Sequence, residues 1–166
     1  SGALLSARGE SIAPTSNGRR ARRYESRDVS FRGPAGRLRG SLLVPPKPRG
    51  AVVLLHGTIP GERDYYRVFG RHFAHHDIAA LIYDRRGSGS SEGPDESTIF
   101  DRADDAGAAI AYLRDQGFPA VGVWAFSNGG WSAPIVARRD PDVAFLIAFG
   151  AAGVTIAEAE VHRRVC

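Results

Sequence analysis

The stretch AVGVWAFSNGG at residues 120–130 decides the fold, because in it a short apolar run ends on a serine that has a small residue two positions away on each side. Its pattern is G-x-S-x-G, with Ala125 at the first glycine position and Gly129 at the second. A strand that turns sharply into a helix crowds the positions two before and two after the turn, so both need small side chains. The spacing therefore predicts that Ser127 stands in a strained turn at the end of a strand and the start of a helix.

A serine held in such a turn is a candidate nucleophile. The next backbone N–H, that of Asn128, then points at the group that the hydroxyl attacks. A pentapeptide of this kind also arises by chance, and the alternative interpretation is a turn whose serine caps a helix. The context favours the nucleophile, because an apolar strand precedes Ser127 and a helix-compatible stretch, residues 130–139, follows it.

The order of the other apolar runs predicts the rest of the fold. A first pair of strands, 29–31 and 38–44, flanks a hairpin turn and is expected to be antiparallel. Buried strands are then expected at 51–55, 78–83, 122–125 and 143–149, and helices at 65–76, 97–116 and 130–139. This alternation predicts an α/β fold with a mostly parallel sheet, helices on both faces and an antiparallel N-terminal hairpin.

The composition fits one domain with a charged tail. The chain has 166 residues with 43% hydrophobic content, which is enough to bury a core, and no apolar run approaches the ~20 residues that span a bilayer. Residues 1–27 are rich in Ser, Gly, Arg and Pro and predict a disordered or linker segment before a domain at 28–166. The absence of methionine predicts that the chain begins inside a longer protein, and its compartment, cytoplasmic or exported, stays open.

The net charge and the single cysteine exclude several function classes. Residues 1–27 hold six arginines against two glutamates, which accounts for the whole formal charge of +4. The basic run at 19–23 could touch nucleic acid, but short basic tails are usually solvated, so we expect no nucleic-acid partner. Cys166 is the only cysteine, which rules out an internal disulfide and a cysteine-based metal site.

Three of the expected parallel strands end in distinctive residues, at 56–58, 84–87 and 127–128. The carboxyl ends of parallel strands meet at one edge of a sheet, so these residues are expected to lie together. A turn with glycine and proline follows the first of these strands and can expose a backbone N–H. We therefore assign the N–H of Thr58 as the second donor of an oxyanion hole, beside that of Asn128.

The neighbouring polar and aromatic residues allow more than one role. Asp84 indicates an internal salt bridge or an anchor for its loop. Trp131 and either Tyr65 or Tyr66 line an acyl pocket in one interpretation and pack against neighbouring helices in the other.

These motifs resemble those of a known family, the α/β-hydrolases, over residues 28–166. The loop after the first parallel strand contains His56 and Gly57, the next strand leads into YDRRGSGS at 83–90, and the third leads into the Ser127 turn. The three features occur in the order in which that fold has them.

Within that superfamily, residues 56–64 and 126–131 are most similar to bacterial esterases and serine-aminopeptidase-like members. The resemblance implies a serine hydrolase that needs no cofactor and acts on an ester, thioester or amide bond. Its partner would be a small acyl substrate or a short peptide, and the oligomeric state stays open. Four residues are expected to shape the site: His56, Gly57, Ala125 and Gly129.

The sequence departs from the family after the nucleophile. The family places an acid and then a histidine after later strands, but only 39 residues follow Ser127 and each strand–helix unit takes about 30 residues. We therefore predict a truncated hydrolase core, with the triad acid and histidine outside this chain. His162 lies in a stretch that indicates a helix leading into a cap, while Asp140 and Asp142 indicate the end of a helix and a turn.

Three alternatives stay open beside a serine hydrolase. The i, i+4 spacing of His72 and His76 could hold zinc, although a solvated helix face fits it better. Gly87, Gly89 and Gly93 resemble a dinucleotide loop, as in an oxidoreductase, but the spacing is one residue too long and indicates a turn. The third alternative is an inactive hydrolase remnant whose open sheet edge needs a partner.

Overall fold

The computed structural model describes residues 24–58, 61–151 and 153–158. The expected tail over its first 23 residues, and His162, therefore lie outside the described residues. No helix in the described ranges is both long and apolar enough to cross a membrane.

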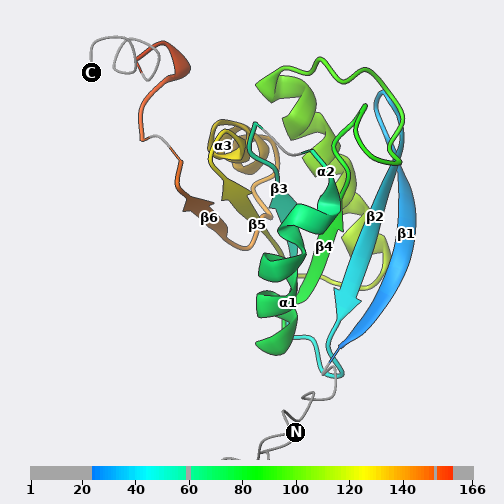
Figure 1. The fold of residues 1–166 in the computed structure, drawn as a ribbon. Helices are drawn as coiled ribbons and strands as arrows, with labels where there is room; N and C mark the ends of the chain where they lie inside the picture. The colour runs from blue at the N-terminus through cyan, green and yellow to red at the C-terminus, as the bar shows by residue number, and fades with distance from the viewer. Residues whose placement is uncertain (1–23, 59–60, 152, 159–166) are drawn as a thin grey trace, which may run out of the picture.

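Six strands form one mixed sheet in the order β1-β2-β4-β3-β5-β6 (Figure 1). The strands are β1 (Glu25–Gly33), β2 (Gly36–Val44), β3 (Ala51–Leu55), β4 (Ala79–Tyr83), β5 (Val121–Phe126) and β6 (Leu146–Phe149). β2 pairs antiparallel with both β1 and β4, and the pairs β4–β3, β3–β5 and β5–β6 are parallel. The α/β class, the mostly parallel sheet and the antiparallel hairpin are thus confirmed.

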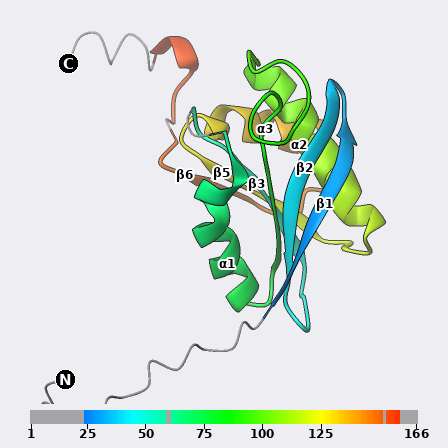
Figure 2. The ribbon, with the colours of Figure 1, turned by 45° about the vertical axis from the view of Figure 1, so that its right-hand side comes forward.

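Helices cover both faces of this sheet, as expected. A 3₁₀ turn, η1 (Arg63–Tyr66), leads into α1 (Arg67–His75), and the longer helices are α2 (Ile99–Asp115) and α3 (Gly129–Arg139). The side chains of η1 and α1 pack in one core cluster, and those of α2 and α3 pack in the other. Figure 2 shows α1 and α2 on opposite sides of the sheet.

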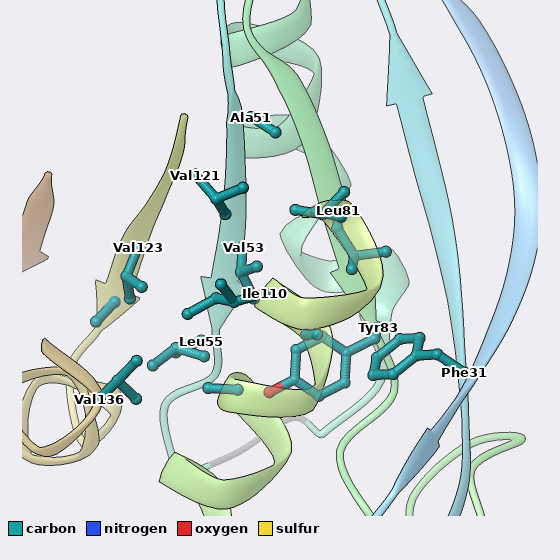
Figure 3. Close-up of a cluster of buried hydrophobic side chains, with 14 of the residues drawn as sticks. Phe31, Ala51, Val53, Leu55, Leu81, Tyr83, Ile110, Val121, Val123 and Val136 are labelled. Atoms are coloured by element: carbon teal, nitrogen blue, oxygen red, sulfur yellow. The ribbon is translucent and has the colours of Figure 1, made fainter. Parts of the chain in front are cut away.

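Alternation along the central strands divides the core between these two layers, because successive side chains of a strand point to opposite faces. In β3, Val52 and Leu54 belong to the cluster under α1, while Val53 and Leu55 belong to the cluster under α2 and α3. Ile110 of α2 lies in the second cluster, which Figure 3 shows between the sheet and that helix.

Two strands begin three or more residues away from the expected position. β1 begins at Glu25, which pairs with Val44, so residues 25–27 belong to the sheet and not to the tail. β6 begins at Leu146, three residues later than expected. Before it, a carboxylate oxygen of Asp140 accepts the backbone N–H of Asp142 at 3.1 Å, which gives this segment a turn.

The beginning of α2 is fixed by its cap. Thr98 precedes the helix, and its hydroxyl accepts the backbone N–H of Asp101 at 3.1 Å while the Asp101 carboxylate accepts that of Thr98 at 2.9 Å. This reciprocal pair is a capping box, which satisfies two N–H groups at the helix N-terminus.

A buried ion pair ties α2 to the loop after β4. Nε and Nη2 of Arg86 donate to the two carboxylate oxygens of Asp105 at 2.7 and 2.8 Å, and both side chains are at most 5% exposed. The loop that follows β4 therefore has a fixed position at the carboxyl edge of the sheet.

Candidate active site

Ser127 stands at the turn between β5 and α3 with a backbone φ of 49°, in the left-handed region. Among the described residues, Asp77 is the other non-glycine residue with a positive φ. This conformation costs a non-glycine residue about 1–2 kcal/mol, so the surrounding structure must impose it. The N–H of Ser127 donates to the carbonyl of Phe149 and its carbonyl accepts the N–H of Gly130, each at 2.9 Å, so the turn is held on both sides.

The two small residues flanking Ser127 lie where larger side chains would collide or displace the core. Ala125 is fully buried in β5. A Cβ atom on Gly129, the first residue of α3, would lie 2.6 Å from the carbonyl oxygen of His56. Glycine therefore lets α3 begin directly against the loop that follows β3.

That loop, residues 56–58, lies against the Ser127 turn. A Cβ atom on Gly57 would lie 3.4 Å from Cβ of Ser127, and Nδ2 of Asn128 donates to the hydroxyl of Thr58 at 2.9 Å. Neither the backbone N–H of Thr58 nor that of Asn128 donates to the backbone or a side chain elsewhere in the described ranges. The structure thus brings together the serine and the two residues assigned as donors, with both N–H groups available.

His56 is the first residue of this loop, and its buried side chain is held by a backbone carbonyl. Its Nε2 lies against the carbonyl oxygen of Tyr83, which can only accept, so Nε2 carries the proton. Burial lowers the pKa of His56 to about 4, and the positive charge of Arg85 acts in the same direction. His56 is therefore neutral at neutral pH, and its Nε2 is engaged by the carbonyl of Tyr83.

Tyr66 has a role that the sequence did not reveal. Its side chain is buried, and its hydroxyl accepts the backbone N–H of Gly57 at 2.8 Å. The adjacent Tyr65 is 55% exposed. The aromatic pair itself was visible in the sequence, but which ring turns inward depends on how η1 packs.

Asp84 anchors both the start of η1 and the loop after β4, as a salt-bridge partner and as an acceptor for backbone N–H groups. Its carboxylate accepts from both the backbone N–H and the guanidinium of Arg63 at 2.8 Å, and from the backbone N–H of Ser90 at 3.0 Å. The prediction of an internal salt bridge or loop anchor at Asp84 is confirmed, with Arg63 as the partner.

The next residue, Arg85, supports the loop after β3 from the side of β4. Its Nη1 donates to the carbonyl of Thr58 at 2.7 Å, its backbone N–H donates to the carbonyl of Gly61 at 2.9 Å, and its Nη2 pairs with Asp95 at 3.0 Å. The side chain is only 10% exposed. Its position two residues after a buried strand was the one available signal, and it did not identify the carbonyl that Arg85 holds.

The glycines of the loop after β4 allow its backbone to turn sharply. Gly87, Gly89 and Gly93 all have positive φ values, and a Cβ atom on Gly89 would lie 2.6 Å from Cγ of Asp84. These are the conformations for which glycine is preferred.

The two histidines with i, i+4 spacing, one in α1 and one directly after it, are exposed. His72 and His76 have ring centroids 4.7 Å apart, and both side chains are exposed. Across the described parts of the chain, no group of three or more His, Cys, Asp or Glu side chains is arranged to hold a metal ion.

Trp131 and Asp140 make specific contacts on α3 and just after it. Nε1 of Trp131 donates to the carbonyl of Val154 at 2.9 Å, so its ring lies against the segment after β6. Asp140 directly follows the last residue of α3, as predicted for a residue that ends a helix. Its carboxylate pairs with Arg114 of α2 at 2.7 Å.

Solved structures of other proteins have the same fold. The α/β-hydrolase GrgF from Penicillium sp. sh18 is 22% identical with a TM-score of 0.72, and the match covers 85% of this chain and 54% of that one. A Pyrococcus furiosus esterase is 23% identical with a TM-score of 0.67, over 77% of this chain and 52% of that one. A Xanthomonas campestris α/β serine hydrolase without a lid is 20% identical with a TM-score of 0.64, over 75% and 60%.

The chain thus spans between about half and three fifths of the length of these relatives. A comparison with curated protein sequences gives no significant match. The family model of the S33 serine aminopeptidases matches residues 46–163, well over half of the chain. Together with the strand order and the helices on both faces, this match shows that the chain belongs to the S33 serine aminopeptidase family of α/β-hydrolases.

Proposed function

We propose that this protein is a serine hydrolase that cleaves an ester, thioester or amide bond, with Ser127 as its nucleophile. The observation that carries the proposal is the left-handed backbone of Ser127 at the end of β5, with a φ of 49°. A strained turn of this kind lifts the serine hydroxyl above the sheet. The substrate in this proposal is a small acyl compound or a short peptide.

The backbone N–H groups of Thr58 and Asn128 are the proposed oxyanion donors. When the hydroxyl of Ser127 attacks a carbonyl, negative charge develops on the carbonyl oxygen, and donors already in place stabilise it. The hydrogen bond between the side chains of Asn128 and Thr58, at 2.9 Å, supports this role because it ties the two donor residues together. Loss of one such donor typically lowers kcat by about 10²–10³-fold.

The hydroxyl of Ser127 also needs a general base. His56 does not suit this role, because it is buried and its Nε2 proton is held by the carbonyl of Tyr83. In the proposed enzyme the acid and the histidine follow the serine in the order Ser, Asp or Glu, His. They would come from sequence beyond the residues that the structure describes.

Labelling with a fluorophosphonate probe tests this proposal on the complete protein that carries these 166 residues. We expect covalent labelling of the wild type and of Ser26→Ala, in which an exposed serine of β1 is removed, but none of Ser127→Ala. Persistent labelling of Ser127→Ala, or a folded complete protein that is never labelled, would contradict the assignment of the nucleophile.

A second candidate function, an inactive fragment that needs a partner to complete its sheet, is favoured by one observation. Edge strand β6 pairs with β5, and its side chains Leu146, Ile147 and Phe149 are 38%, 42% and 53% exposed. An open apolar edge promotes association with another strand. On this alternative the 166-residue chain forms dimers or larger species.

Light scattering coupled to size-exclusion chromatography tests the second candidate. Ile147→Lys should then reduce the association, whereas Val68→Lys, at a 65% exposed position on α1, should not. A monomeric chain that the fluorophosphonate labels at Ser127 would count against the fragment and for the enzyme.

A further inference from the structure

A small cavity lies behind the loop at 56–58, where the ends of β3 and β4 meet α2 and α3. Its volume is about 10 Å³, which is room for a single water-sized guest. Most of its polar lining comes from Arg85, Arg102, Asp105 and Ser132. These residues come from the loop after β4, from α2 and from α3.

Three atoms in this lining lack a hydrogen-bond partner. They are Nε of Arg85, Nη1 of Arg102 and Oγ of Ser132, all buried and without a partner in the described part of the chain. The Ser132 side chain is fully buried. Buried polar atoms are almost always paired, and three unpaired ones around one cavity point to a missing partner inside it.

Asp105 and His56, which also line the cavity, are engaged with other residues. The two carboxylate oxygens of Asp105 each accept from Arg86, at 2.7 and 2.8 Å, and Nε2 of His56 is held by Tyr83. The other nitrogens of Arg85 are bonded to Thr58 and to an aspartate. The unpaired atoms are thus left over after each side chain has made its contacts.

The chemistry of the three atoms defines the guest. The Nε and Nη1 groups are donors only, and the serine hydroxyl can donate or accept. Arg85 and Arg102 are close enough for the positive charge of Arg85 to lower the pKa of Arg102, after the larger effect of burial. Arg102 makes no salt bridge within the described residues, so an acceptor between the two guanidinium groups would reduce their repulsion.

We propose that this cavity binds one hydrogen-bond acceptor with a single heavy atom, either a water molecule or a chloride ion. The guest accepts from Nε of Arg85 and Nη1 of Arg102 and forms a hydrogen bond with the hydroxyl of Ser132. A cavity of this volume with three polar partners meets the requirements of an ordered internal water. The guest would join three elements that meet behind the Ser127 turn, and it does not depend on the proposed hydrolase activity.

A high-resolution crystal structure, with one crystal grown in chloride and one soaked in sodium bromide, tests the proposal directly. A density peak about 3 Å from all three atoms is expected. Anomalous scattering at the peak in bromide identifies a halide, and its absence identifies water; either result supports the site. An empty cavity, or a Ser132 hydroxyl bonded to the carbonyl of Asn128 in its own helix, would overturn it.

The effect of Ser132→Ala on the thermal midpoint gives an independent test in solution. With a guest bound, Ser132→Ala removes a hydrogen bond and should lower the thermal midpoint by a few degrees. Without a guest, the same change removes an unpaired buried hydroxyl and should leave the midpoint unchanged or raise it, which would contradict the proposal. Ser26→Ala on exposed β1 is the matched control and should have no effect.

The anion present during unfolding separates the two possible guests. A wild-type midpoint that is higher in chloride than in gluconate at equal ionic strength, with the difference lost in Ser132→Ala, identifies chloride. Equal midpoints in the two salts, together with the drop in Ser132→Ala, identify water.

Discussion

At the scale of single residues, the side chain of Arg85 holds the carbonyl of Thr58, whose own N–H is a proposed oxyanion donor. In Arg85→Met this support is lost while the Thr58 N–H itself remains. We expect kcat for p-nitrophenyl acetate to fall roughly tenfold with little change in KM, because the effect is on the transition state. Steady-state kinetics of the complete protein measures this split.

The control for Arg85→Met is Arg71→Met, which removes an exposed arginine from α1 and should leave both constants unchanged. Arg85→Lys should restore part of kcat, since an ammonium group can make one hydrogen bond to the Thr58 carbonyl. An Arg85→Met enzyme with wild-type kcat would show that the loop is held without this contact.

His56 should make the stability of the protein depend on pH. Its pKa is lowered to about 4 in the folded state, below the unfolded value of about 6.5, because burial disfavours the charged form. The unfolded state therefore binds a proton more readily, and this contribution to stability is complete above pH 6.5 and is lost as the pH falls toward 4. The lost free energy of unfolding is on the order of 3 kcal/mol.

Urea unfolding of the wild type and of His56→Gln between pH 7 and pH 4 measures this contribution. The amide of the variant can still donate to the Tyr83 carbonyl but does not titrate. The variant should lose less stability than the wild type across this range, and parallel losses in the two proteins would contradict the assigned protonation state.

At the scale of elements, the contact between the start of α3 and the end of β3 requires Gly129. Gly129→Ala would place a Cβ atom 2.6 Å from the carbonyl oxygen of His56, so the helix must shift, at a cost of about 1–3 kcal/mol. Gly107→Ala on α2 meets nothing within 4 Å and should stabilise the protein by about 0.5–1 kcal/mol. Urea unfolding measures whether Gly129→Ala lowers the free energy of unfolding while Gly107→Ala raises it. A change in the same direction in both variants would contradict the close approach.

The attachment of α2 to the loop after β4 depends on a buried charge. Asp105→Asn removes the buried partner of the Arg86 guanidinium and leaves it the more exposed Asp101, and should cost about 3 kcal/mol. Asp104→Asn breaks a pair with Arg139 whose side chains are 47–48% exposed, and should cost at most about 1 kcal/mol. Chemical denaturation of the two variants compares the pairs, and similar losses would mean that burial does not decide their strength.

At the scale of the whole molecule, the sequence predicted the sheet because its buried strands are continuous apolar runs, such as residues 51–55. The small residues around Ser127 likewise predicted the strained turn. The contacts of Tyr66 with Gly57 and of Arg85 with Thr58 could not be predicted, because they depend on how η1 and the loop after β4 pack in space. Neither contact leaves a periodic signal in the sequence.

The hydrogen bond from the N–H of Ser127 to the carbonyl of Phe149 joins the proposed nucleophile to the outermost strand of the described sheet. A polypeptide that pairs with the open side of β6 would restrain that strand and, through this bond, the backbone of the Ser127 turn. Pairing at this distant edge of the sheet would then also stiffen the turn that carries the proposed nucleophile.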